Sequence, residues 1–510
     1  MNFAIIIDSV PAVALYDGPK SALSRRRPRS EVSMAQDGKF PEEKKLGPQY
    51  SSLMIEEAPH YANRIFYSLG FLAATSFAML VVTGVVEVFF GSTWWLTKPA
   101  GIFFRSLHLW STQAFIVFIL LHLVVVFCTM GFRGPRRITW IFGVAMFFFA
   151  LIETELGYAL RGDFSTQWRA LQGADFFNGS GLGWWINPLN ELKIFGIHTA
   201  IAPLIIIALL ALHYSLVRFL GIATPPKPEA EYRVEKANHV VLFLRGGVVV
   251  ILIVVLAALF PSPYLKPVTI AEAAKSDPNL VAQTLAGEFG RLEQIGTDPD
   301  SRDLTSGYSD NIQPYTFDTR TIFVDVPWKQ MIASGQTPDD LAAVEQLPAD
   351  GQKKLVDEAV DFFGDNKGGV KESDDPLIGV MKRLTTLAAA GWYDSSLKGM
   401  GEPGDNTYQL RFLSDLGVLE DQAEKLHMLT EQWGMLREEE TARPGAWWLA
   451  PIGILNQTIL AKDENGDRDG AYILGILILI LAAVPFIPGV RKIPVLLRLY
   501  VPFQRKPRKK

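Results

Sequence analysis

Two stretches decide the fold: residues 105–125 read RSLHLWSTQAFIVFILLHLVV, and residues 197–215 read IHTAIAPLIIIALLALHYS. Each is apolar over a length that can cross the ~30 Å hydrocarbon core of a bilayer. Each also carries two histidines about four helical turns apart, which at 1.5 Å per residue is about 21 Å along the axis. Each helix is therefore expected to present two imidazoles on broadly one face, one near each membrane surface.

These four histidines predict two metal centres stacked across the membrane. His108 and His122 are 14 residues apart, and His198 and His213 are 15 apart. A single imidazole in lipid needs a partner, and a hydrogen bond to a neighbouring helix would be sufficient. Two pairs at two depths instead suit haem iron, which accepts a neutral imidazole on each side, whereas zinc would need further ligands. We expect His108 to pair with His198 near the outer surface, and His122 with His213 near the inner one.

Glycines repeat this spacing on the first and third apolar segments. Gly70 and Gly84 are 14 residues apart, as are Gly143 and Gly157. A flat macrocycle lying against a helix needs the side chain removed at each contact, although glycine also serves close helix packing in membranes. The match to the histidine spacing favours haem packing and predicts a four-helix diheme bundle.

The remaining apolar segments predict an all-α integral membrane protein with two further spanning helices. The six segments are 66–90, 106–130, 138–160, 193–220, 240–260 and 471–488. Arginine and lysine gather in the loops after the second and fourth segments and at both chain ends, which places those parts in the cytoplasm. A polar stretch between the last two segments then lies outside, and it carries about twice as many acidic as basic side chains.

The expected organisation follows from these segments. The parts are a disordered cytoplasmic leader (1–54), the four-helix diheme domain (55–222), a loop with the fifth membrane helix (223–267), an acidic, mainly helical extracytoplasmic insert (268–443), and a segment with the sixth membrane helix and a basic tail (444–510). Within the insert, 338–363 and 409–440 are the clearest helical stretches. The insert either steers a basic soluble redox partner or only solubilises the outer face.

Charged residues before two of the histidines suggest contacts to haem propionates. Arg105 precedes His108 by three residues, and Lys193 precedes His198 by five. Either would pair with a propionate at the outer surface, or simply extend to the membrane interface. The chain has one cysteine, Cys128, which excludes an intramolecular disulfide and a haem attached through two cysteines.

Several strings resemble the cytochrome b/b6 family of quinol–cytochrome c or plastocyanin oxidoreductases. They are APHYANRIFYSLG (58–70), FRSLHLW (104–110), GFRGPRRITWIFGV (131–144), GYAL (157–160) and IHTAIAP (197–203). The resemblance covers about 55–260 and 444–508, and the histidine spacing is similar to the b6 branch with part of its second subunit fused. It implies two non-covalent haems b, a quinone substrate, a Rieske iron–sulfur protein and a c-type cytochrome as partners, and a homodimeric complex.

The chain departs from this family at positions that matter for mechanism. Ser68 stands where the b6 branch has the cysteine that binds an extra haem, so no covalent haem is expected. Val125 replaces a basic residue, and Arg161-Gly162 replaces Pro-Trp after the third segment. The run Gly445-Ala446-Trp447-Trp448 stands where the family has Pro-Glu-Trp-Tyr, whose glutamate is thought to accept a quinol proton.

Without that glutamate, the catalytic residues stay open. A proton acceptor must lie within hydrogen-bond reach of the quinol. Asp163, Trp447 and Trp448 are the candidates at this site, and Glu153 or Glu155 would be substitutes unless they are buried structural groups.

The sequence is compatible with three functions. The leading one is the cytochrome b subunit of a bc-type complex in a bacterial cytoplasmic membrane, with the insert on the periplasmic side, oxidising quinol with electron bifurcation. The second keeps both haems but acts as a non-bifurcating electron conduit in another respiratory complex. The third is a haem-free scaffold or transporter, which would make the four histidines and four glycines a coincidence. Membrane lipid is an expected partner and nucleic acid is not.

Overall fold

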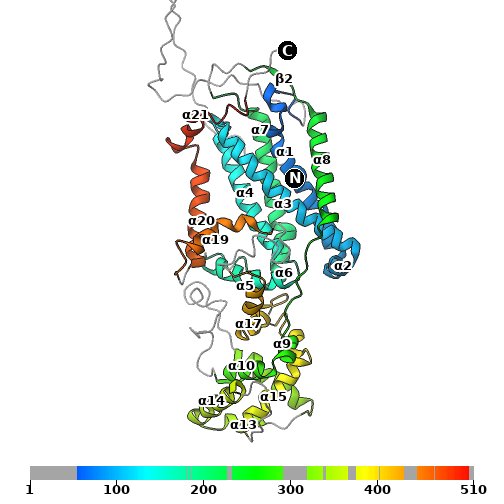
Figure 1. Ribbon diagram of the computed structural model, residues 1–510, viewed down its shortest axis with the longest axis vertical. Coiled ribbons are helices and arrows are strands. Elements are labelled where there is room, and N and C mark those ends of the chain that lie inside the picture. Colours follow the sequence, from blue (N-terminus) through cyan, green and yellow to red (C-terminus); the bar gives the residue numbers. More distant parts are fainter. Residues whose placement is uncertain are drawn as a thin grey trace, which may run out of the picture. The chain divides into compact units, whose positions relative to one another are not determined.

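A computed structural model describes residues 54–179, 181–183, 185–226, 232–290, 319–336, 340–365, 375–400, 402–429, 445–463 and 466–504. Apart from its last residue, the expected leader (1–54) lies outside these residues. Regular structure among them is almost entirely helical (Figure 1). Two short strands, β1 (Glu57–Pro59) and β2 (Val234–Lys236), pair antiparallel with Glu57 opposite Lys236.

Five described helices are long and apolar enough to cross a membrane, which confirms the predicted membrane bundle. They are Ile65–Phe90 (η2, Ile65–Ser68, and α1, Leu69–Phe90), Pro99–Cys128 (α3), Gly134–Tyr158 (η3, Gly134–Arg136, and α4, Arg137–Tyr158), Glu191–Leu220 (α6, Glu191–Gly196; η4, Ile197–Ile201; α7, Ala202–Leu220) and His239–Leu259 (α8). A run of 21 or more residues reaches about 30 Å as a helix, because each residue adds about 1.5 Å.

The bundle forms by pairwise packing of these helices. Helix α1 packs along α3, α4 packs along α7, and α8 lies against both α1 and α3 (Figure 1). Gly246 permits the close approach of α8, because a Cβ there would lie 3.0 Å from the ring of Phe71. In the interior, Phe77 of α1 stacks on Phe115 of α3 with ring centroids 5.4 Å apart.

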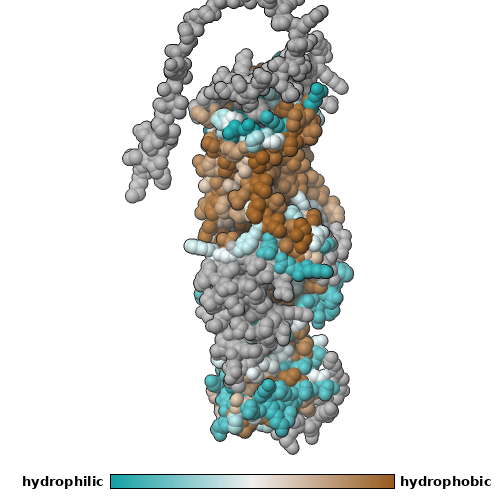
Figure 2. Space-filling model, turned by 90° about the vertical axis from the view of Figure 1, so that its left-hand side faces the viewer, coloured by the Kyte–Doolittle hydropathy of each residue, from teal (hydrophilic) through white to brown (hydrophobic). Residues whose placement is uncertain are grey.

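The outer surface of these helices is apolar. On α8, Val248, Ile251 and Leu259 each expose about two thirds of their surface. Figure 2 shows a band of hydrophobic residues on one face of the molecule. Exposed apolar area of this extent fits lipid contact, since soluble monomers expose only small apolar patches.

The sixth predicted span corresponds to a helix whose apolar part is shorter than expected. Helix α20 (Gly466–Ala483) begins five residues before the predicted 471–488 segment. Its apolar part, Asp469–Ala483, has 15 residues. It packs against α4 and against α19 (Ala450–Gln457). Its crossing of the membrane stays a prediction.

The insert folds into short helices around its own core. Its described helices are α9 (Ile270–Ser276), α10 (Pro278–Gly290), η5 (Thr321–Asp325), α12 (Val326–Ala333), α13 (Asp340–Glu345), α14 (Ala349–Asp365), α15 (Pro376–Ala389), α16 (Trp392–Ser396), α17 (Thr407–Asp415) and α18 (Val418–Lys425). Phe323, Leu384 and Phe412 are fully buried in this core. Phe164 and Trp168 of α5 (Phe164–Gly179) belong to the same hydrophobic cluster, so the core of the insert extends to the segment after α4.

The two helical stretches predicted within the insert are each interrupted. Pro348 separates α13 from α14 because it lacks an amide hydrogen and disfavours a helical conformation before it. Gly417, with φ +70°, ends α17 before α18 begins. Residues 430–440 of the second stretch lie outside the described residues. The short elements not yet named are η1 (His60–Asn63), α2 (Ser92–Thr97), η8 (Trp447–Leu449), η9 (Val490–Lys492) and α21 (Ile493–Leu496).

Candidate functional site

His108 of α3 and His198 of η4 face each other inside the bundle. Their ring centroids are 6.2 Å apart and their planes are inclined by 70°. A metal lies about 2 Å from a bound imidazole nitrogen, and that nitrogen lies about 1 Å from the ring centre, so two imidazoles on opposite sides of one metal have centroids about 6 Å apart. The two rings therefore stand at the separation that a shared iron requires.

Hydrogen bonds to backbone carbonyls fix the tautomer of two of the four histidines. Nδ1 of His198 lies 3.2 Å from the carbonyl oxygen of Glu153, and Nδ1 of His213 lies 3.1 Å from that of Thr139. A carbonyl oxygen can only accept, so Nδ1 carries the proton in both rings. The lone pair on Nε2, the atom that would bind iron, is then free.

The hydroxyl group of Thr83 fixes the tautomer of His108. Its Oγ1 lies 2.8 Å from the carbonyl oxygen of Met79 and 2.9 Å from Nδ1 of His108. Because the hydroxyl hydrogen is donated to Met79, the oxygen accepts from Nδ1 of His108. Nε2 of His108 is therefore also free.

The four predicted glycines each lie against one of the four imidazoles. The distances from a Cβ built on the glycine to Cε1 of the histidine are 3.3 Å for Gly84–His108, 3.2 Å for Gly70–His122, 3.5 Å for Gly143–His213 and 2.8 Å for Gly157–His198. The glycines of α1 thus lie against the histidines of α3, and the glycines of α4 lie against the histidines of the fourth span. The structure shows room for the imidazole rings, and contact with a macrocycle stays a prediction.

A π-helical turn explains why the two histidine spacings differ by one residue. His198 lies in η4, where the amide of Ala202 donates to the carbonyl of Ile197, five residues earlier. Pro203 follows and lacks the amide hydrogen of a regular helical turn. A single π turn accommodates one extra residue, so 15 residues on this helix correspond to 14 on α3. Such turns are frequent at functional sites.

The facing imidazoles of His108 and His198 offer two nitrogen ligands to one metal ion. Among the described residues, no three histidine, cysteine or carboxylate side chains gather where they would hold a metal ion. Two neutral nitrogen ligands on opposite sides suit an iron whose other ligands come from a macrocycle.

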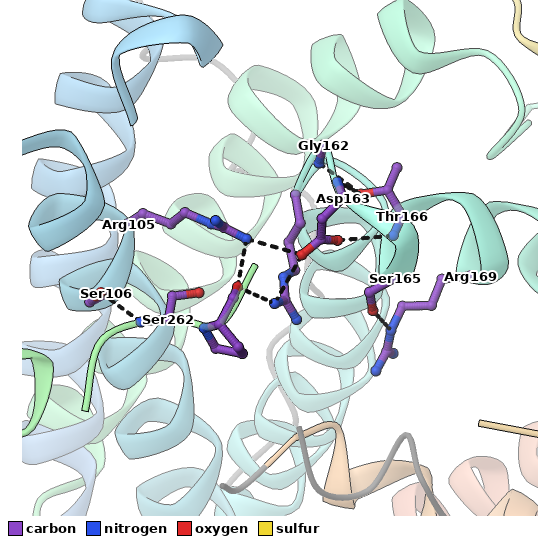
Figure 3. A network of polar contacts seen from close by, with 10 residues as sticks. Arg105, Ser106, Gly162, Asp163, Ser165, Thr166, Arg169 and Ser262 are labelled. Atoms are coloured by element: carbon purple, nitrogen blue, oxygen red, sulfur yellow. Dashed lines mark hydrogen bonds and ion pairs between the residues drawn. The ribbon is translucent and has the colours of Figure 1, made fainter. Parts of the chain in front are cut away.

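Asp163 is held in a buried ion-pair network (Figure 3). Its Oδ2 lies 3.2 Å from Nη2 of Arg105 and 3.2 Å from Nη2 of Arg161, and both arginines also donate to the carbonyl of Pro263. Its Oδ1 accepts from the amide of Thr166, and the side chain is fully buried. This geometry favours a structural role for Asp163 over proton acceptance from a quinol, and it shows that Arg105 already pairs with one carboxylate.

Lys193, the other candidate for a propionate, pairs with the insert. Its Nζ lies 2.6 Å from Oε2 of Glu402, and about half of each side chain is exposed. A backbone hydrogen bond joins the same two segments, since the amide of Glu191 donates to the carbonyl of Gly404. Lys193 thus lies where α6 meets the insert.

Trp447 is tied to α3. Its Nε1 donates to Oε1 of Gln113 at 2.7 Å, and Nε2 of Gln113 donates to the carbonyl of Gly445 at 3.1 Å. One amide side chain therefore fixes the start of the 445–457 segment.

Trp448 is tied to α4 through Glu155. Its Nε1 donates to Oε1 of Glu155 at 2.6 Å, while Oε2 of Glu155 lies 3.2 Å from Nη1 of Arg169. The guanidinium of Arg169 lies 4.2 Å from the ring centre of Tyr158, which also contacts Trp448 edge-on. Both oxygens of Glu155 are occupied, which favours a structural role for this carboxylate.

Glu153, the third carboxylate considered, lies at a histidine. Its Oε1 is 3.1 Å from Nδ1 of His198.

Ser68, at the position of the family's extra cysteine, accepts a hydrogen bond from Arg245 of α8 at 2.6 Å.

Sequence reasoning missed Thr83, Gln113 and Arg169. Each is a polar side chain in or beside an apolar span, where a polar group needs a partner. That signal marks them as candidates without naming the partner, because the partner comes from another helix.

Comparisons with known proteins agree with these motifs. A family model described as Cytochrome b(N-terminal)/b6/petB matches residues 113–270. Cytochrome b6 of Heterocapsa triquetra is 31% identical over 201 residues, which are 34% of this chain and 90% of that protein. Cytochrome b6 of Heliobacterium modesticaldum is 28% identical over 192 residues, 33% of this chain and 89% of that protein. A chain of a solved structure entitled "Hyperthermophilic respiratory Complex III" aligns with 64% of this chain and 90% of its own length, at 16% identity and a TM-score of 0.34. Because the similarity to one cytochrome b6 spans nine tenths of that protein at 31% identity, this chain belongs to the cytochrome b/b6 family.

Proposed function

We propose that this chain is the diheme cytochrome b subunit of a bc-type respiratory complex and carries electrons from quinol across the membrane. The observation that supports this best is the facing pair of His108 and His198 at 6.2 Å. These two would hold one haem b near the outer surface, and His122 with His213 would hold a second near the inner surface. When bound, the haems would supply one-electron carriers at two depths of the bilayer.

The residues around the histidines would orient these ligands. Thr83 and the carbonyls of Glu153 and Thr139 each accept a hydrogen bond from an Nδ1, which fixes ring orientation. Gly70, Gly84, Gly143 and Gly157 would leave space for rings and macrocycles. Arg105 and Lys193 remain the proposed propionate partners, in addition to the carboxylates that they already contact.

The proposed setting follows from charge and resemblance. The proposed location is a bacterial cytoplasmic membrane, and the basic loops favour an orientation with residues 268–443 on the periplasmic side. A Rieske iron–sulfur protein and a c-type cytochrome are the proposed electron acceptors, and a homodimeric complex in lipid is the proposed assembly.

A second candidate is a non-bifurcating electron conduit in another respiratory complex. Ala446 stands where the family has its glutamate. Asp163 is bound by two arginines, and Glu155 is bound by Trp448 and Arg169. Of the three carboxylates considered, Glu153 alone keeps an oxygen, its Oε2, without a hydrogen-bond partner among the described residues, and its other oxygen lies at His198.

Haem content tests the proposal directly. The full chain, purified from membranes, should show a b-type alpha band in a reduced-minus-oxidised spectrum and two haems per chain. His108→Gln and His198→Gln should each remove the same haem, and His122→Gln and His213→Gln the other. His427→Asn is the control, since His427 is exposed in the insert with φ +56°, which asparagine tolerates. A chain without any b-type band would refute the proposal.

A separate measurement distinguishes the two candidates. In membranes that contain the intact complex, addition of oxidant should transiently reduce haem b if quinol oxidation is bifurcated. A simple conduit would show only oxidation of haem b.

A further inference from the structure

We infer that Glu153 is a positioning residue that lowers the reduction potential of one haem, the one held by His108 and His198. This inference rests on the proposed haem binding and goes beyond it. The potential is lowered through a hydrogen bond from the His198 imidazole to a carboxylate, whereas His108 and His213 donate to neutral acceptors.

The geometry directs Nδ1 of His198 at residue 153 alone. Oε1 of the Glu153 side chain lies 3.1 Å from this nitrogen, and the carbonyl oxygen of the same residue lies 3.2 Å from it. Nδ1 carries one hydrogen, so the two oxygens share it. The side chains of both residues are less than one fifth exposed, which keeps water from screening the contact.

The carboxyl group of Glu153 pairs with no described side chain other than His198. Its Oε2 is buried and has no hydrogen-bond partner among the residues that the structure describes. Glu155, two residues further along α4, differs in this respect because Arg169 and Trp448 occupy its oxygens. The carboxylate of Glu153 is therefore directed to the imidazole of His198.

The contacts differ between the two proposed haems. Thr83 offers a hydroxyl oxygen to His108, and Thr139 offers a carbonyl oxygen to His213. A hydrogen bond to an ionised acceptor is roughly twice as strong as one to a neutral acceptor. The carboxylate therefore makes His198 a more basic ligand than His213.

A more basic ligand and a nearby anion both favour oxidised iron, which carries one more positive charge than reduced iron. The effect is large inside a protein, because the local dielectric constant is far below that of water. Hydrogen bonding around a haem is one of the means by which a protein sets haem potential. Glu153 thus separates the potentials of two haems whose four ligands are chemically identical.

A redox titration of the full chain with its haems tests this inference. Glu153→Gln keeps an oxygen acceptor and removes the charge, so the midpoint potential of one haem should rise while the other stays the same and both haems remain bound. The haem that shifts should be the one that His198→Gln removes, and its low-temperature electron paramagnetic resonance signal should shift too. Glu155→Gln is the matched control on the same helix and should move neither midpoint.

Other outcomes would overturn the inference. Two bound haems with unchanged midpoints in Glu153→Gln, or equal shifts of both haems, would show that the carboxylate does not tune one site. If Glu153→Gln fails to retain haem, Glu153→Asp is the deciding variant, because it keeps a carboxyl group but moves it away from Nδ1 of His198. A rise in the midpoint potential of one haem would then support the inference, and unchanged midpoints would refute it. A wild-type chain without haem would instead refute the proposed function.

Discussion

Gly157 and His198 lie so close that a Cβ at position 157 would be 2.8 Å from Cε1 of the imidazole. The equivalent pair at the other end of α4, Gly143 and His213, leaves 3.5 Å, which is ordinary van der Waals contact. The same helix therefore holds one glycine that admits no side chain without movement of the ring and one that does.

Gly157→Ala should reduce the haem content from two per chain to one. The added methyl group would displace the imidazole of His198, while alanine in a helix is otherwise favoured over glycine by about 1 kcal/mol. Gly143→Ala should keep both haems, as measured by pyridine haemochrome on purified chain. Equal loss in the two variants would contradict a steric role specific to Gly157.

The histidines and glycines were predictable because lipid makes polar groups and missing side chains conspicuous. His108 and His198 face each other, as expected from helix periodicity together with the loop charges that set the direction of the two helices. The spacing of 15 residues gave no sign of a π turn, because the extra residue becomes visible only when the backbone hydrogen bond from Ala202 to Ile197 is known.

The partners of these groups were not predictable. Thr83 and His108 meet across two helices, and Gln113 and Trp447 are 334 residues apart in the chain. Such contacts depend on how each helix is rotated about its axis, which hydrophobicity constrains only weakly when most faces are apolar. For the same reason the sequence offers Asp163 as a candidate acceptor without showing the two arginines that pair with it.

Thr83→Val should weaken haem binding at the site of His108. Valine has nearly the same shape but cannot accept from Nδ1, so the imidazole loses its orientation. Removing such a partner typically costs about 10- to 100-fold in metal-site affinity. Haem retention during dilution in detergent measures the effect. Thr75→Val is the control, because the Thr75 hydroxyl on the same helix donates to the carbonyl of Phe71; a similar loss there would point to general damage of α1.

Asp163→Asn should destabilise the protein strongly. Removing this charge takes away the carboxylate that the buried Arg105 and Arg161 share, and breaking a buried pair costs about 3–5 kcal/mol. The temperature of unfolding in detergent should fall clearly. Glu402→Gln, which breaks the half-exposed pair with Lys193, should cost only about 0–1 kcal/mol. An Asp163→Asn protein of normal stability that has lost only quinol oxidation would instead make Asp163 catalytic.

Gln113→Leu should release the 445–457 segment from α3 while leaving the haems in place. The substitution removes the partners of two groups at once, Nε1 of Trp447 and the carbonyl of Gly445, and each buried polar group left unpaired costs about 1–3 kcal/mol. Gln113 lies five residues after His108, which places the two side chains on different faces of α3. We therefore expect lower thermal stability and slower quinol oxidation with an unchanged haem spectrum. Gln113→Glu keeps the acceptor for Trp447 and should lie between wild type and Gln113→Leu; if both variants lost haem as well, Gln113 would support the haem site rather than the segment that holds Trp447.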